Sequence, residues 1–326
     1  MAHLPGLVAI AAWPRVINTV TYYSSKNMKT IQELLAEKPN DSDPQPVQYV
    51  GTVEAYDKWA EVYDTDGNFL QRLDTIEMRL LLPIFLDRVY TRFQAQSGQL
   101  TLLDLGCGTG RNTIQLLEAL AQYRRQNEKD ITSPTKVDVV GLDASPGMLD
   151  VARSAIQTST QREDLKSSPE VTLDTIDLRH PATVRAQLPA SLQSSGAAGV
   201  ISTLVLEHIP AKAFFEAASA TMAPGGYLLV TNMHADMGMR SQAGFTDPQT
   251  GVKIRPTSYC HSVSEVLAAA EEAGFQVEDI VGQEGQGQDG VLERDVDEQL
   301  AEKLGVRAKK WVGIRVWFGV CFSKKA

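Results

Sequence analysis

The stretch TLLDLGCGTGRNTIQLL, residues 101–117, limits the possible folds of this chain more than any other feature. An apolar run ends at Asp104, glycines follow at alternate positions, and apolar residues then recur with helical spacing. This order predicts a strand, a tight loop and a helix. Gly106, Gly108 and Gly110 allow the backbone to turn sharply and a ligand to lie directly against it. An ordinary strand-to-helix turn of an α/β domain is the alternative.

The spacing of these glycines differs from that of a dinucleotide-binding loop. Such a loop has its third glycine three residues after the second, which lets a pyrophosphate rest on the helix N-terminus. In this chain that position is Arg111. The sequence therefore disfavours an NAD-dependent oxidoreductase.

Further apolar runs follow the loop, and most of them end beside an acidic residue. VDVVGL is followed by Asp143, VTLDTI by Asp177, and the run that begins at residue 199 by Glu207; a fifth run is YLLVTN, residues 227–232. Helical segments separate the runs, which predicts right-handed crossovers and a doubly wound, mostly parallel α/β sheet. Ligands of such sheets bind outside the carboxyl ends of the strands, so we expect the acids at one site.

Asp143 has two possible roles at the end of the second strand. Its carboxylate is well placed to accept hydrogen bonds from both hydroxyls of a ribose. The alternative is an N-cap of the helix that begins near Pro146, because aspartate is favoured at that position and proline suits the first turn.

The C-terminal third completes the predicted sheet. Residues Ser262–Glu265 have the spacing of a capping box, and Gly274 stands where the helix should end. Residues 275–281 are then expected to form a sixth strand. Apolar residues alternate along residues 312–322, which predicts a seventh strand.

Two features of the sequence resemble those of a known family. The G-x-G-x-G spacing behind Asp104 is similar to motif I of the class I S-adenosylmethionine-dependent methyltransferases. YDKWAEVYDTDGN, residues 56–68, resembles a segment of ubiquinone- and menaquinone-type methyltransferases, Williams-Beuren-region methyltransferase-like proteins and many fungal natural-product enzymes. The resemblance to the fold covers residues 101–325. It implies a seven-stranded, Rossmann-like sheet with an antiparallel last strand, and a helical lid over the methionine end of the cofactor.

The resemblance implies S-adenosylmethionine as cofactor, S-adenosylhomocysteine as product, and a set of binding residues. Asp143 would hold the ribose, and Asp177 would face the adenine amino group. One packed helix face would also explain Tyr56, Trp59 and Tyr63, because they lie three and four residues apart; we prefer that explanation for Trp59 and leave Tyr63 open. The implied cofactor-binding residues are Tyr63, Asp104, Gly106, Cys107, Gly108, Gly110, Asp143, Ala144, Met148, Asp177, Leu178, Leu204 and His208.

Methyl transfer from a sulfonium needs few catalytic groups. The methyl carbon is a strong electrophile, so the protein mainly holds a nucleophile in line with the carbon–sulfur bond and excludes water. An alcohol or phenol must in addition lose a proton to a base. By resemblance His208 is a structural or cofactor-contacting residue, so we expect His234 and His261 to be the catalytic bases. A purely structural histidine is the alternative at each position.

The chain divides in this interpretation into an N-terminal helical arm and lid, residues 1–98, and a methyltransferase domain, residues 99–326. An insertion at about residues 233–261 carries methionines that suit an irregular apolar pocket. We expect O- or N-methylation of a small molecule, typically in natural-product or secondary metabolism. The alternative is a protein of this fold that binds the cofactor but acts as a pericyclase-like or regulatory protein.

Composition limits the kinds of partner that the chain is expected to bind. The 326 residues are 43% hydrophobic, enough for a full α/β core and an added module, and a net charge of -9 argues against nucleic-acid binding. No run reaches the ~18 apolar residues of a membrane span. The apolar residues 4–13 lack a preceding Lys or Arg, so we expect them to cover the substrate entrance or form a homodimer rather than to target the chain. Three cysteines without C-x-x-C spacing predict no metal site and a cytoplasmic protein.

Overall fold

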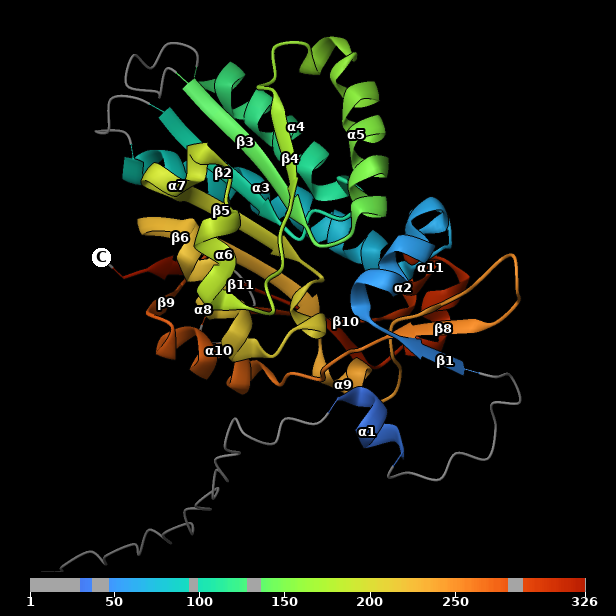
Figure 1. Cartoon of the computed structure of the whole chain (residues 1–326). Helices are drawn as coiled ribbons and strands as arrows, with labels where there is room; N and C mark the ends of the chain where they lie inside the picture. Colours follow the sequence, from blue (N-terminus) through green and yellow to red (C-terminus); the bar gives the residue numbers. More distant parts are fainter. Residues whose placement is uncertain (1–29, 37–46, 94–98, 128–135, 281–289, 326) are drawn as a thin grey trace, which may run out of the picture.

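The computed structural model describes residues 30–36, 47–93, 99–127, 136–280 and 290–325. Its centre is an eight-stranded sheet in the order β10-β11-β6-β5-β2-β3-β4, with β9 also paired to β11 (Figure 1). Strands β2 to β6 run parallel, and β11 is antiparallel to its neighbours. This is the predicted doubly wound sheet. The strands are β2 (Gln99–Leu105), β3 (Lys136–Asp143), β4 (Val171–Thr175), β5 (Ala197–Thr203), β6 (Met222–Met233), β9 (Phe275–Glu278), β10 (Val291–Asp295) and β11 (Arg315–Lys324).

The edge beside β11 differs from the expected single sixth strand. β9 and β10 both pair with β11, β9 near its end and β10 along its first part, so two short strands share one edge. The prediction of a strand as far as residue 281 was too long, because β9 ends at Glu278. β10 was not predicted, since Glu293, Arg294 and Asp295 make it look like a solvated segment. In the structure Arg294 pairs with the buried Glu77.

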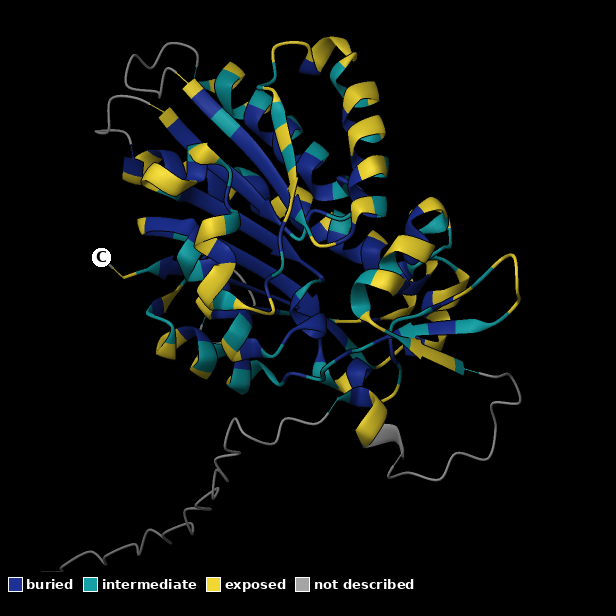
Figure 2. Ribbon diagram, in the orientation of Figure 1, coloured by how far each residue is buried: buried dark blue, intermediate teal, exposed yellow. Residues whose placement is uncertain are grey.

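Helices cover both faces of the sheet. α3 (Phe69–Phe93), α4 (Arg111–Gln126) and α5 (Pro146–Thr160) contribute to one apolar cluster. α6 (Pro181–Gln187), α7 (Ala190–Ser195), α8 (Ala211–Thr221) and α10 (Val263–Glu272) contribute to the other. Successive strand residues alternate between the two clusters, as Leu102 and Leu103 do. Figure 2 accordingly shows the central strands buried and the outer sides of the helices exposed.

A second, three-stranded sheet joins two distant parts of the chain. β1 (Val47–Val50) pairs in parallel with β8 (Lys253–Pro256), and β7 (Phe245–Thr246) pairs antiparallel to β8. We call residues 47–68 together with residues 234–261 the lid. It also contains α2 (Thr52–Trp59), η1 (Ala60–Val62) and α9 (Ala235–Gly238), and it lies to one side of the main sheet in Figure 1. Beyond the lid, Thr30, just before α1 (Ile31–Ala36), bridges to Tyr259.

The remaining elements are short. η2 (Glu163–Leu165) and η3 (Leu206–His208) are single turns, and α11 (Glu298–Leu304) is followed by η4 (Val306–Trp311). Among the described helices, none combines the length and apolar character needed to traverse a lipid bilayer. Within the same ranges, no group of three or more metal-ligating side chains gathers. The expected role of residues 4–13 lies outside the described residues.

Candidate active site

The glycine loop between β2 and α4 has a backbone that requires glycine. Gly106, Gly108 and Gly110 have φ of +80°, +53° and +82°, in the left-handed region that other residues rarely adopt. A Cβ on Gly106 would lie 2.2 Å from a methyl of Val205, whereas a Cβ on Gly108 would meet no atom within 4 Å. The first glycine therefore permits close packing, and the second leaves open space beside the backbone.

Asp143, at the end of β3, fixes this loop. One carboxylate oxygen accepts the Gly108 N–H at 2.8 Å, and the other accepts the Ser145 N–H at 2.8 Å. Burial raises the pKa of Asp143 above its usual value, and these backbone N–H donors oppose the rise. The N-cap of α5 is Ser145, which accepts from the Met148 N–H, so the alternative role of Asp143 as the N-cap is wrong. Each carboxylate oxygen keeps a second lone pair for a ligand.

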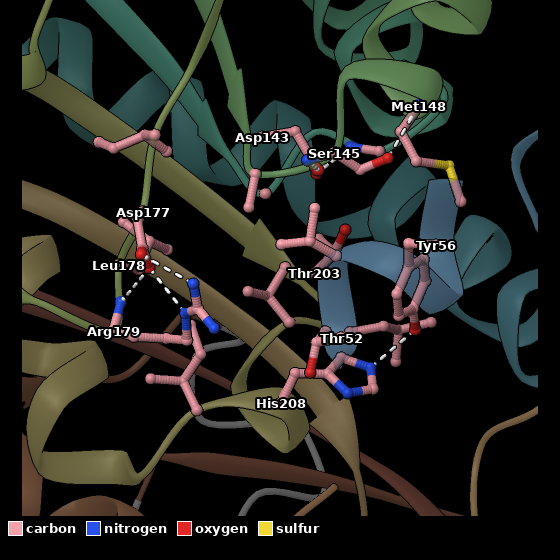
Figure 3. Close-up of a pocket in the computed structure, with 18 of the residues that line it drawn as sticks. Thr52, Tyr56, Asp143, Ser145, Met148, Asp177, Leu178, Arg179, Thr203 and His208 are labelled. Carbon is pink, nitrogen blue, oxygen red and sulfur yellow. Dashed lines mark hydrogen bonds and ion pairs between the residues drawn. The ribbon is translucent and has the colours of Figure 1, made fainter. Parts of the chain in front are cut away.

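A pocket opens at the carboxyl ends of β2 to β5, between the sheet and the lid (Figure 3). Of the residues predicted to bind the cofactor, all except Asp104, Cys107 and Gly110 line this pocket, which we call pocket 1. Several other lining residues were not predicted from the sequence, namely Thr52, Ser145, Ile176, Arg179, Thr203 and Val205.

The three exceptions support the loop from behind. Asp104 is fully buried and accepts the Thr113 hydroxyl at 2.6 Å, and burial raises its pKa to about 7. Cys107 is buried against Gly141, where an added Cβ would lie 3.1 Å from its sulfur. Gly110 packs against α5, since its Cβ would lie 3.3 Å from Ala152. Asp104 therefore lies beneath the loop, whereas Cys107 and Gly110 are loop residues that pack against β3 and α5 rather than line the pocket.

Asp177 is already engaged by its neighbours. Its carboxylate accepts hydrogen bonds from Nε and Nη2 of Arg179, each at 2.9 Å (Figure 3). It also lies 3.2 Å from Nδ1 of His180. The Arg179 guanidinium holds the pKa of Asp177 at about 2. If Asp177 accepts a hydrogen bond from an adenine amino group, its carboxylate oxygens must accept from that group and from Arg179 at the same time.

His208 fastens the lid over pocket 1. Burial lowers its pKa to about 4, so the ring is neutral near pH 7. Its Nδ1–H donates to the Thr257 carbonyl at 3.1 Å, and its Nε2 accepts the Tyr56 hydroxyl at 2.7 Å. Thr257 and Tyr56 belong to the two separate segments of the lid. One histidine thus holds both of them, and Figure 3 shows its ring facing Tyr56.

The acidic residues of the YDKWAEVYDTDGN segment anchor the lid to the core. Asp57 accepts the Ser145 hydroxyl at 2.6 Å and the Gly147 N–H at 3.0 Å, at the start of α5. Asp64 accepts the Thr109 hydroxyl of the glycine loop at 3.0 Å. The segment therefore docks onto both loops that form pocket 1, a role that its sequence did not reveal.

A second pocket lies next to the first. Tyr56, Tyr63 and Leu204 line both, so they form the wall that the two pockets share. Among the residues that the structure describes, Leu204 is the one non-glycine residue with positive φ, +56°, a conformation that marks functional sites when the surrounding structure enforces it. The second pocket, pocket 2, is lined by residues that include Trp59, Phe69, Glu207, Met233, Met237, Gln242, Arg307, Lys310 and Trp311.

The two predicted bases lie elsewhere. Nδ1 of His234 accepts the Asp236 N–H at 3.1 Å as the N-cap of α9, and its Nε2 lies 3.2 Å from a Glu293 oxygen. His261 is buried, and its Nε2–H lies 3.1 Å and 2.9 Å from the carbonyls of Leu206 and Ile209. Neither ring lines pocket 1 or pocket 2. Their assignment as bases stays a prediction.

The glycine loop, the acid that ends the next strand and the antiparallel last strand together define a class I methyltransferase architecture. Residues 22–280 match the model of a family described as a methyltransferase domain. A protein of Emericella nidulans, named an uncharacterized methyltransferase, is 49% identical over 303 residues, which are 90% of this chain and 99% of that protein. The chain belongs to this methyltransferase family, and its methyl donor is S-adenosylmethionine.

Solved structures with the same type of fold are more distant. Magnesium protoporphyrin IX methyltransferase from Synechocystis PCC 6803, solved with S-adenosylhomocysteine, is 16% identical, with a TM-score of 0.44 over 84% of this chain and 95% of that one. The [4+2]-cyclase SpnF is 16% identical, with a TM-score of 0.46 over 86% of this chain and 99% of the other.

The residues of pocket 1 fit S-adenosylmethionine. The open space beside Gly108 lets a ligand lie on the loop backbone. Asp143 offers two oxygens with free lone pairs for the ribose hydroxyls, and Ile176, Leu178 and Ile209 give the pocket apolar walls for an adenine ring.

Proposed function

We propose that this protein transfers the methyl group of S-adenosylmethionine to an oxygen or nitrogen atom of a small molecule held in pocket 2. The observation that carries the proposal is the shared wall of the two pockets, which consists of Tyr56, Tyr63 and Leu204. In-line displacement needs donor and nucleophile on opposite sides of the methyl carbon, ~3–3.5 Å apart. Two adjoining pockets meet this need.

The chain mainly binds, orients and excludes water in this mechanism. Asp143 would hold the ribose, Leu178 and Asp177 the adenine, and Tyr63 the methionine end. The donor supplies an electrophilic methyl group and leaves as a neutral thioether. The His208–Tyr56 hydrogen bond would keep the lid closed, which keeps water from the reacting atoms.

Binding and turnover together test the proposal. Purified protein is titrated calorimetrically with S-adenosylmethionine, S-adenosylhomocysteine and NAD, and we expect binding of the first two alone. Transfer of a labelled methyl group is then measured with a library of hydroxylated and amino compounds. Failure to bind either sulfur compound would refute the proposal. Binding without consumption of the donor by any acceptor would instead favour the pericyclase-like or regulatory alternative.

The same assay tests the two predicted histidine bases. If His234 or His261 were a base, its replacement by alanine would lower turnover far more than cofactor affinity. The engaged ring nitrogens described above lead us to expect loss of stability instead, measured as a lower melting temperature with turnover of the folded fraction retained. A variant that keeps its melting temperature but loses turnover would restore that histidine as a base.

The setting of the reaction belongs to the same proposal. The resemblance of residues 56–68 to fungal natural-product enzymes supports secondary metabolism. All three cysteines are free in the structure, which supports a reducing compartment such as the cytoplasm.

A further inference from the structure

Pocket 2 contains two buried oxygen atoms that lack partners. They are Oε2 of Glu207 and Oε1 of Gln242, and both residues line the pocket. The residues are only 5% and 8% exposed. Gln242 is held in place because its Nε2 donates to the Pro256 carbonyl at 2.8 Å. Within the described part of the chain neither oxygen finds a donor, and buried acceptors of this kind are normally satisfied by a ligand or water.

Glu207 sits where the two pockets meet. Its backbone N–H lies 3.3 Å from the Asn232 side-chain oxygen, and its carbonyl accepts the Tyr259 N–H at 2.6 Å, which fixes η3. One carboxyl oxygen lies 3.6 Å from Nε2 of His208, and His208 lines pocket 1. The side chain therefore belongs to pocket 2 but lies next to the wall of the donor pocket. Met233 adds apolar surface on the same side.

We propose that Glu207 takes the proton from the methyl acceptor, and that this acceptor is a phenol or enol whose second hydrogen-bond donor reaches Gln242. The inference rests on the proposed function. The acceptor hydroxyl gives its proton to Oε2 of Glu207 while a lone pair of its oxygen forms the bond to the methyl carbon. The carbon–sulfur bond breaks, and its electron pair stays on sulfur as the neutral thioether.

The acidity of the two groups explains the acceptor class. Burial raises the pKa of Glu207 to about 8. Proton transfer is efficient when base and acid have similar pKa values, and a phenol has a pKa of ~10. An aliphatic hydroxyl, about as weakly acidic as water with a pKa of ~15.7, is a poor match. Apolar lining residues such as Met237 and Trp311 suit an aromatic ring.

The charge of the donor should control the protonation of Glu207. Besides the neutral His208, the titratable and charged groups that face Glu207 or line the same pocket are Tyr56, Tyr63, Asp66, Asp74, Arg307 and Lys310. Near pH 7 the buried carboxyl is mostly protonated in the empty protein. A sulfonium cation in the adjoining pocket favours the carboxylate, so donor binding should release a proton.

Calorimetry in buffers of different ionisation enthalpy measures this release without any acceptor. At pH 7 we expect binding of S-adenosylmethionine to release close to one proton, and binding of S-adenosylhomocysteine, which lacks the sulfonium charge, to release none. Glu207→Gln should abolish the release while binding S-adenosylhomocysteine within about twofold of the wild type. Glu61→Gln, the same change at an exposed residue of η1, should behave as the wild type.

The outcomes separate the two proposals. Equal proton release with both ligands, or release that persists in Glu207→Gln, would overturn the role of Glu207. If Glu207→Gln did not fold, the comparison of the two ligands on the wild type would still decide. Absence of binding by either ligand would refute the proposed function instead.

Methyl transfer tests the acceptor class. Phenol, catechol and 2,7-dihydroxynaphthalene are compared with benzyl alcohol, whose hydroxyl is aliphatic. We expect the dihydroxy compounds to be methylated best and benzyl alcohol not at all, with turnover about 10²- to 10⁴-fold lower in Glu207→Gln. Because Glu207 is already ionised at pH 7 once the donor is bound, the turnover number of the wild type should rise with pH below 7 and level off above it, and this rise should be absent from the variant. Methylation of benzyl alcohol as fast as of the phenols, or of none of the compounds, would overturn the acceptor class.

Discussion

Asp143 serves two needs with one carboxylate. It holds the backbone of the glycine loop and the start of α5 together, and the same oxygens face pocket 1. Removing the carboxylate should therefore disturb the shape of the pocket as well as a contact with the ribose.

We predict that Asp143→Ala weakens binding of S-adenosylhomocysteine by about 10- to 150-fold, because a hydrogen bond to a charged group contributes ~1.5–3 kcal/mol. Titration calorimetry measures the loss. Asp150→Ala is the matched control, since Asp150 lies on α5 with its side chain 77% exposed and paired with Arg153. Wild-type affinity in Asp143→Ala would exclude Asp143 as a ribose ligand.

Residue by residue, the sequence was most informative where a requirement is local. The glycines at left-handed φ and the capping box of Ser262 and Glu265 follow from backbone geometry alone, and both are confirmed. The engagement of His261 could not be foreseen, because its carbonyl partners lie more than 50 residues away. Glu207 was predicted at the end of the fourth strand, but β5 ends at Thr203 and Glu207 lies in η3. Its burial beside pocket 2 follows from the fold alone.

Among the elements, α3 is bound to the sheet by a buried polar network. Asp74 is fully buried and accepts hydrogen bonds from Arg111 and Asn112 of α4, from Thr231 of β6 and from Trp317 of β11. Arg111, the residue that breaks the dinucleotide pattern, thus has a structural partner. One carboxylate connects four elements beneath the site.

We predict that Asp74→Ala lowers the free energy of unfolding by about 3–5 kcal/mol, because Arg111 and the other donors would lose their buried acceptor. Urea denaturation followed by circular dichroism measures the change. Asp150→Ala should cost less than ~1 kcal/mol as an exposed ion pair. A similar small loss in Asp74→Ala would show that water replaces the carboxylate.

The lid is held closed by aromatic packing across its two segments. Trp59 of α2 stacks on Phe245 of β7 with ring centroids 5.1 Å apart and planes 15° apart. We predict that Phe245→Ala loosens the lid locally, so that amides of residues 47–59 and 245–256 exchange at least about tenfold faster while those of β2 do not change. Hydrogen exchange with mass spectrometry measures both. Equally faster exchange in β2 would mean that the lid and the sheet unfold together.

Strand pairing explains why some strands were predicted from the sequence and others were not. β2, β3, β5 and β6 have β-branched or apolar runs that are buried on both faces, so their apolar character located them. β4 lies at the edge of the sheet and has no buried residue, and it was located by its alternating sequence. β10 is charged and lies at an edge, where its partners Glu77 and Arg315 come from distant segments. The pairing of β1 with β8 has no local signal at all, because it joins residues about 200 positions apart.

At the scale of the whole molecule, buried titratable groups make stability depend on pH in opposing ways. The pKa of His208 falls from 6.5 to about 4 on folding, so between these values the unfolded chain binds a proton that the folded chain does not. The contribution of His208 to the free energy of unfolding is present above pH 6.5 and is lost as the pH falls toward 4. Glu207 has the opposite effect, because its pKa rises from 4.5 to about 8 on folding. Its contribution to the free energy of unfolding is therefore lost as the pH rises over that range.

We predict that His208→Gln flattens the acid side of the stability profile. The change in free energy of unfolding between pH 6.5 and 4 should shrink by up to about 3 kcal/mol, from 1.36 kcal/mol per pKa unit. Melting temperatures of the wild type and the variant across this range measure it. Parallel profiles would show that other groups govern the acid sensitivity.

The parallel pairing of β1 with β8 also sets an order for biosynthesis. Residues 47–50 leave the ribosome early, but their partner strand is residues 253–256, so the enclosure around the reacting atoms stays incomplete until most of the chain has been translated. The glycine loop, by contrast, follows β2, which pairs with β3 within residues 99–143. A nascent chain can thus form β2, β3 and the glycine loop between β2 and α4 well before the lid can exclude solvent from the reaction.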